Sequence, residues 1–227
     1  MVTGVFAFVI MCIFLLQMFA FSVLFVMKIT NRVVRDGYWS KSMLQSIDEA
    51  AADDSSYEFL CYRYAKLAKT DSGLSFCSMT RDVFFSVEQE AVCRFGHDHA
   101  VPDKDCTCGW YSLHTAASLD EVRFQNGNRL HVVLQCSYSG TVIPAKKGIR
   151  AAKQHVLKAF VPATCEVRGC TQSSQSVCIA NDTHKKLFGK GQPDPTMIFC
   201  ETHQPEEWDI YSVVDLRNAL GCEVVFV

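Results

Sequence analysis

Cysteine and histidine side chains gather in two stretches of the chain at spacings typical of metal binding. The 227-residue sequence contains 12 cysteines and 7 histidines. The first stretch, CRFGHDHAVPDKDCTCGWYSLH, covers residues 93–114. Structural zinc takes four thiolate or imidazole ligands in a tetrahedral arrangement. We therefore predict a first zinc site formed by Cys93, His99, Cys106 and Cys108.

This first stretch leaves two alternatives open. His97 lies two residues before His99 and is the alternative imidazole ligand. Gly109 follows the Cys-x-Cys pair, and a glycine permits the tight turn that brings two neighbouring sulfurs onto one ion. A thiol redox pair or metal sensor that uses Cys106 and Cys108 is the competing interpretation, and it requires a thiolate of low pKa.

A second set of ligands is predicted in the C-terminal third. Two half-sites, C-x4-C and C-x2-H, are separated by a long insertion and resemble short treble-clef or ribbon-like zinc modules. We predict a second zinc site formed by Cys165, Cys170, Cys200 and His203. A cysteine and a histidine within the insertion are alternate ligands: Cys178 and His184.

The remaining cysteines are isolated in the sequence, and we expect packed thiols rather than metal ligands at these positions. They are Cys12, Cys61, Cys77, Cys136 and Cys222. We expect His114, at the end of the first stretch, to lie at the surface or behind the ligands.

No motif in the sequence places a general base or an open metal position beside these ligands. The H-E-x-x-H and H-x-E…P-C-x-x-C patterns are absent, and so are glycine-rich phosphate loops. The formal charge of -2 gives no strong field that would attract nucleic acid. We therefore predict two closed, structural zinc sites and no enzymatic activity.

The first stretch also resembles a known family. The arrangement Cys93…His99-Ala-Val-Pro102-x3-Cys106-x-Cys108-Gly109-x-Tyr111 resembles a C…H-x-A-P-x3-C-x-C-G-x-Y signature of uncharacterised proteins of actinobacteria and their bacteriophages. A downstream G-x-R-A motif of that family is similar to Gly148-Ile149-Arg150-Ala151. The resemblance implies a bacteriophage-type protein and a hairpin over residues 148–161. It implies no activity.

An apolar run, VFAFVIMCIFLLQMFAFSVLFVM, occupies residues 5–27 and contains no charged side chain. A helix needs about 20 such residues to cross a bilayer, and the run lacks the basic start and cleavage site of a signal peptide. Basic residues follow it, at Lys28, Arg32, Arg35 and Lys41. The positive-inside rule then predicts a single-pass membrane protein, in contact with lipid, whose C-terminal domain is cytoplasmic. A reducing compartment favours metal ligation over disulfides.

Beyond this run the patterns indicate more strand than helix. Residues 42–56 begin as a helix and continue as an acidic linker, and residues 57–92 alternate as strands with a hairpin turn at 71–73. Further strands are predicted at 121–124 and 130–142, with a turn at 126–128. Residues 148–161 fit either a helix or a return strand. Residues 211–220 form a helix capped by Gly221, and 222–227 form a last strand.

These elements predict an α+β fold, in which a single N-terminal transmembrane helix precedes a β-rich soluble domain with zinc-binding loops. The expected divisions are an anchor at 1–28, a juxtamembrane helix and linker at 29–56, a β-rich domain at 57–161, and a zinc-knuckle-like segment at 162–227.

The function predicted from these features is a membrane-anchored zinc protein that acts as a binding or adaptor module for a protein partner. The alternative is nucleic-acid binding through the C-terminal knuckle, since lysine and arginine residues cluster nearby. They are Lys146, Lys147, Arg150, Lys153, Lys158, Lys185, Lys186 and Lys190.

Overall fold

Two 14-residue strands, β6 (His131–Pro144) and β7 (Gly148–Val161), form an antiparallel hairpin at the centre of the fold. The first half of β7 has helix-forming composition, but β7 pairs with β6 along one edge and with β5, β4 and β11 along the other. Both edges of β7 are therefore hydrogen-bonded to neighbouring strands, and these contacts hold the segment in the extended conformation. The hairpin alternative for residues 148–161 is therefore confirmed.

The computed structural model describes residues 39–51, 59–71, 73–79, 83–122, 130–167, 169–180 and 196–227, which all belong to one unit, Tyr38–Val227. The other elements are α2 (Lys41–Ala51), β1 (Leu60–Thr70), β2 (Gly73–Cys77), β3 (Phe84–Phe85), β4 (Glu88–Glu90), β5 (Trp110–Leu113), η1 (Ala117–Glu121), β8 (Ser176–Ile179), β9 (Thr196–Met197), η2 (Glu201–His203), β10 (Asp209–Ser212), α4 (Val213–Leu220) and β11 (Glu223–Phe226).

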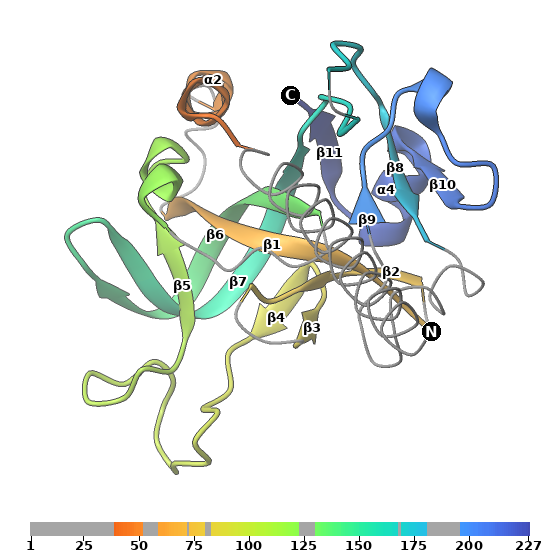
Figure 1. Cartoon of the computed structure of the whole chain (residues 1–227). Coiled ribbons are helices and arrows are strands. Elements are labelled where there is room, and N and C mark those ends of the chain that lie inside the picture. Colours follow the sequence, from red (N-terminus) through yellow and green to blue (C-terminus); the bar gives the residue numbers. More distant parts are fainter. Residues whose placement is uncertain are drawn as a thin grey trace, which may run out of the picture. The chain divides into compact units, whose positions relative to one another are not determined.

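The pairing of the central strands closes on itself. β1 pairs with β6, β6 with β7, β7 with β5, and β5 with β1, all antiparallel (Figure 1). Register shifts at Gln135/Cys136 and at Ser139/Val142 bend β6 so that it can pair with both neighbours. β11 joins the same sheet in parallel with β7, and β10, β8 and β9 form a second, 3-stranded sheet.

The main hydrophobic core draws on both the central strands and the C-terminal stretch. Leu67 and Leu134 of the central strands share it with Ile198 and Leu216, and all four side chains are almost fully buried. Helix α2 covers a second core cluster, into which it buries Leu44 and Ile47.

The prediction of an α+β fold is wrong. The described chain is mostly β-sheet, and α2 and α4 are short helices of 11 and 8 residues. Residues 148–161, which fit either a helix or a return strand in the sequence, form the strand β7. Pairing with distant strands overrides that local preference.

The prediction of a single-pass membrane protein with a cytoplasmic domain is also corrected. In the part of the chain that the structure describes, no helix has the length and apolar character needed to cross a bilayer. The apolar run at residues 5–27 and the predicted anchor at 1–28 lie outside the described residues, as do residues 29–38 and 52–56 of the predicted division 29–56. Without a cytoplasmic location the compartment no longer favours metal ligation over disulfides, and the geometry of the thiols has to distinguish the two.

Most of the smaller elements follow the sequence patterns. The turn at 71–73 joins β1 to β2, α2 begins at Lys41, and Gly221 caps α4 in the left-handed conformation at φ 72°. The strand predicted at 121–124 is wrong at its start, because Glu121 ends the 3-10 helix η1. Val122 is the residue that caps η1, and residues 123–124 and the turn at 126–128 fall outside the described residues.

Candidate metal centres

The long loop between β4 and β5 carries the first set of donors, well away from the main core (Figure 1, yellow-green). The ligand atoms of Cys93, His97, His99 and Cys106 all lie within 4.8 Å of one another. The Cys108 sulfur lies 4.0 Å from Nε2 of His99 and is buried with the other two thiols. The loop therefore groups three of the four predicted donors, Cys93, His99 and Cys106, with the alternative ligand His97, whereas Cys108 lies outside this mutual set and approaches it at His99.

The spacing of the sulfurs fits a tetrahedral metal ion. The sulfurs of Cys93 and Cys106 are 3.7 Å apart. A disulfide requires about 2.05 Å, whereas two sulfurs that each lie about 2.3 Å from a tetrahedral zinc ion are separated by about 3.8 Å. All cysteines of the described chain are free thiols. The donor set and its dimensions therefore suit zinc.

The two histidines of the loop differ in how their rings are held. Nδ1 of His99 lies 2.8 Å from the carbonyl oxygen of Ala100, so that an N–H there donates to the carbonyl and leaves Nε2 as the metal-facing nitrogen. His97 is exposed, and its ring lies against the ring of Phe95 at 5.6 Å between centroids. The hydrogen bond to a backbone carbonyl is the usual way in which a protein orients a ligating imidazole.

Gly109 and Arg150 hold the end of the loop. Gly109 adopts φ 109°, and a Cβ at this position would lie 2.9 Å from Cβ of Pro102 and 3.0 Å from Cγ of Arg150, so only glycine fits. The Arg150 guanidinium donates to the carbonyl oxygen of Cys106, and to that of Cys108 at 3.3 Å. Sequence reasoning quoted Arg150 only as part of a motif and of a basic cluster, and missed that it supports the loop.

Burial and hydrogen bonds to the sulfurs act in opposite directions on the pKa of the first-loop thiol Cys93. Burial opposes ionisation of Cys93, but backbone hydrogen bonds from Phe95 and His97 lower its pKa to about 7. Burial, together with the neighbouring Cys108 thiol, raises the pKa of Cys106. The raised pKa disfavours a reactive thiolate at Cys106 itself, because a reactive thiol needs the thiolate form at neutral pH.

The second set of donors is also brought together. The ligand atoms of Cys165, Cys170, Cys200 and His203 all lie within 4.8 Å of one another. Sulfurs of Cys170 and Cys200 are 3.7 Å apart, and the Cys165 sulfur lies 3.6 Å from Nδ1 of His203. These values match the edges of a tetrahedron around zinc, about 3.8 Å between sulfurs and about 3.6 Å between sulfur and nitrogen.

Backbone turns build the two half-sites and a carboxylate joins them. The N–H groups of Cys170 and His203 each donate to the carbonyl three residues earlier at 2.9 Å. Each of these turns brings the two metal ligands of its half-site to the same side of the chain. Glu166 donates its N–H to the carbonyl of Ile198 at 2.9 Å and accepts the N–H of Ile198 at 2.7 Å through its carboxylate. A hydrogen bond with the Thr202 hydroxyl lowers the pKa of Cys200 to about 6.

Two Cys/His clusters are thus placed to hold two metal ions, as the predicted pair of zinc ions requires. Cys178, an alternate ligand in the sequence, is instead fully buried in β8, where burial raises its pKa to about 11. His184 lies outside the described residues. His114 is exposed, as predicted, with Nδ1 3.7 Å from the sulfur of Cys61.

The cysteines that the sequence predicts to be packed thiols are buried or half-buried wherever the structure describes them. Cys61, Cys77 and Cys136 are buried, and Cys222 is half-buried against the main core. Cys12 lies outside the described residues.

Comparison of the chain with protein-family models, with curated proteins and with solved structures finds no match. The resemblance of the first loop to the actinobacterial and bacteriophage family therefore stays a prediction.

Proposed function

We propose that this protein is a zinc-stabilised β-sheet module that acts by binding a partner molecule rather than by catalysis. The observation that carries the proposal is the spacing of the two Cys/His donor sets, in each of which one pair of sulfurs is 3.7 Å apart. Structural zinc contributes on the order of 10–16 kcal/mol of apparent binding free energy at neutral pH. That free energy is available to order loops that contain few buried side chains of their own.

Four carboxylates close in sequence to the clusters take part in contacts within the protein, which supports structural zinc over catalytic zinc. A hydrolytic zinc site needs an open position and a free general base. Asp103 accepts the N–H of Asp105 within the first loop, and Glu166 binds the N–H of Ile198 in the second. Glu88 and Glu90, just before the first loop, pair with His155 and Lys153. Each of these acids is occupied in holding the chain together.

Contacts of the basic side chains that the structure describes argue against the nucleic-acid alternative, and Lys185, Lys186 and Lys190 lie outside the described residues. Lys147 pairs with Glu121, and Lys158 lies 3.8 Å from Glu223. Arg150 is engaged by two carbonyl groups of the first loop. The basic stretch therefore presents less free positive charge to a phosphate backbone than its sequence indicates, and phosphate neutralisation is the main source of nucleic-acid affinity.

Elemental analysis of the purified chain tests the proposal. We expect two zinc ions per chain, and cobalt substitution should give the visible absorption of tetrahedral thiolate ligation. Cys106→Ser and Cys200→Ser should each remove one ion, while Cys222→Ser, which alters a thiol outside both clusters, should retain both. Less than one metal ion per chain, or metal content that neither ligand variant lowers, would refute the proposal.

A further inference from the structure

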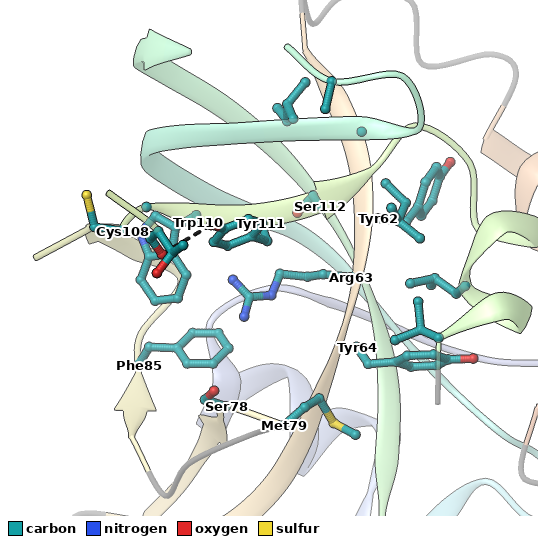
Figure 2. A pocket seen from close by; sticks show the side chains of 18 of the residues that line it. Tyr62, Arg63, Tyr64, Ser78, Met79, Phe85, Cys108, Trp110, Tyr111 and Ser112 are labelled. Atoms are coloured by element: carbon teal, nitrogen blue, oxygen red, sulfur yellow. Dashed lines mark hydrogen bonds between the residues drawn. The ribbon is translucent and has the colours of Figure 1, made fainter. Parts of the chain in front are cut away.

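A cavity of about 640 Å³ opens beside the first loop, between the middle of β1, the strand β5 and the residues just before β7. Its walls are largely apolar and aromatic, with Tyr62, Phe85, Trp110 and Tyr111 around it (Figure 2). Cavities of roughly 300–1,000 Å³ with mainly apolar walls and a few polar groups are typical of small-molecule sites. The cavity contains one of the predicted zinc ligands, Cys108, and is otherwise separate from both clusters.

Arg63 of β1 extends into this cavity (Figure 2). Its guanidinium lies 4.8 Å from the ring centroid of Trp110 and 5.3 Å from that of Phe85. Nη1 donates to Oε1 of Gln154 at 3.0 Å, whereas Nε is buried and has no hydrogen-bond partner among the described residues. A buried donor left without a partner is costly, and a charged one more so.

The charge of the cavity is unbalanced. Three cations line it, Arg63, Arg94 and Lys147, and none of the lining residues that the structure describes is acidic. Lys147 has its own carboxylate in Glu121. Arg94 instead contacts the Phe95 ring and the Thr107 hydroxyl. An arginine fork matches carboxylate and phosphate groups, so a cavity whose described lining carries cations and no acid suits an anionic ligand.

The rim of the cavity carries exposed apolar side chains. Val92 is 82% exposed, Tyr111 53% and Val83 51%, and all three line the opening. Exposed apolar side chains that gather at a concave site mark a surface that binds something, whereas scattered ones do not.

The walls are fixed before any ligand arrives. The Trp110 indole N–H donates to the carbonyl of Gln89 at 3.1 Å, and the Tyr111 hydroxyl donates to the carbonyl of Thr107 at 3.1 Å. Thr107 lies between Cys106 and Cys108, so the first metal loop positions one wall of the cavity. A preformed site loses little conformational entropy on binding.

We propose that this cavity binds a small organic acid, whose carboxylate or phosphate pairs with Arg63 and whose flat apolar body packs against Trp110 and the neighbouring rings. The inference goes beyond the proposed function, because it assigns a ligand class to a site that zinc does not occupy. A partner protein that offers an acidic side chain to the same cavity is an alternative that the test below separates.

Three probes of matched shape test this inference on the zinc-loaded full-length chain. They are naphthalene-2-carboxylate, its neutral carboxamide, and 2-naphthyl phosphate. Titration calorimetry measures affinity, and the indole N–H signal of Trp110 in nuclear magnetic resonance spectra locates the ligand. We expect at least one anionic probe to bind saturably and to shift the Trp110 signal. The affinity of the carboxamide should be lower by a factor of about ten or more.

Two variants of the same strand provide the control. Arg63→Met removes the charge inside the cavity and keeps an apolar stem, and should weaken the anionic probe about tenfold or more. Lys69→Met removes a charge from β1 outside the cavity and should leave the affinity unchanged. If Arg63→Met fails to fold, the preference of the wild-type chain for acid over amide still decides.

Equal binding of acid and carboxamide would overturn the inference, and so would the absence of saturable binding of all three probes at millimolar concentration. In that second case a partner protein becomes the remaining occupant of the cavity. Zinc content is measured on the same samples. Two zinc ions without probe binding would refute this inference alone, and probe binding without zinc would refute the proposed function alone.

Discussion

At the first metal site the structure offers one donor more than a tetrahedral ion needs. Cys93, His97, His99 and Cys106 are mutually close, and Cys108 approaches His99 from the side. The hydrogen bond from Nδ1 of His99 to the carbonyl of Ala100 distinguishes the two imidazoles, because it fixes one tautomer with Nε2 free. We infer that His99 is the ligand, as the sequence first indicated, and that His97 lies beside the ion.

His99→Ala should therefore lower the zinc affinity of the first site by at least about tenfold, and His97→Ala should lower it less. Competition with a chromophoric chelator measures both affinities, and the second site serves as an internal reference. The reverse order of the two variants would make His97 the ligand.

A buried histidine makes stability depend on pH. His131 on β6 is 7% exposed, and burial, with the nearby charge of Lys66 adding to it, lowers its pKa to about 4. The imidazole of an unfolded chain titrates near pH 6.5. Between about pH 6.5 and pH 4 the unfolded chain thus binds more protons than the folded chain, and stability falls as the pH falls.

We expect the wild-type chain to lose about 2 kcal/mol more unfolding free energy between pH 7.5 and pH 5 than His131→Leu does. Urea unfolding at the two pH values measures this difference. Release of metal at low pH lowers the unfolding free energy of both proteins alike, so it cancels in the difference between them. Equal losses in the two proteins would show that His131 is protonated as readily in the folded chain as in the unfolded chain.

At the scale of elements, the parts that the sequence predicts well are those whose cause is local. The turn at 71–73 and the Gly221 cap need only a glycine in the left-handed region next to a periodic segment. The error at residue 121 has a distant cause. The carboxylate of Asp48 on α2 accepts the N–H groups of Ala116 and Ala117 at 2.7 and 2.9 Å and stabilises the start of η1.

The metal sites divide in the same way. The donors were predictable because thiols and imidazoles at short spacing in a polar loop have few other roles. The role of Arg150 in supporting the first loop was not predictable. Its contact with that loop depends on the strand register that sets Tyr111 of β5 opposite Arg150 of β7. Arg63 was not predictable either, because Gln154, Phe85 and Trp110 reach it from three separate strands.

Gly109→Ala tests whether the shape of the first loop is needed for metal binding. The added Cβ would overlap Pro102 and strain a φ of 109°. We expect a loss of about 1–3 kcal/mol in stability, with weaker zinc binding at the first site only. Gly73→Ala is the matched control, because Gly73 has φ 119° and open space around it. It should show backbone strain but no change in zinc affinity. Equal zinc affinity in the two variants would contradict the role of the loop.

At the scale of the whole molecule, the two metal centres stand in different relations to the core. The first cluster buries its thiols against Val101 and forms a small cluster of its own. The second is joined by Glu166 to Ile198, which is fully buried in the main core, and Cys200 lies two residues beyond Ile198. A zinc ion at the second site thus ties down a strand connection on which the main core depends, whereas one at the first site orders a loop.

Loss of the second metal ion should therefore destabilise the protein more than loss of the first. We expect the melting temperature of Cys200→Ser to fall below that of Cys106→Ser by about 6–12 °C, which corresponds to roughly 3 kcal/mol for a chain of this size. Calorimetry measures both values, with Cys222→Ser as the control for loss of a thiol outside the clusters. Amide hydrogen exchange adds the location, since Cys106→Ser should expose amides of the first loop and leave β6 and β7 protected. A melting temperature of Cys106→Ser equal to or below that of Cys200→Ser would mean that the first loop, and not the second, holds the core together.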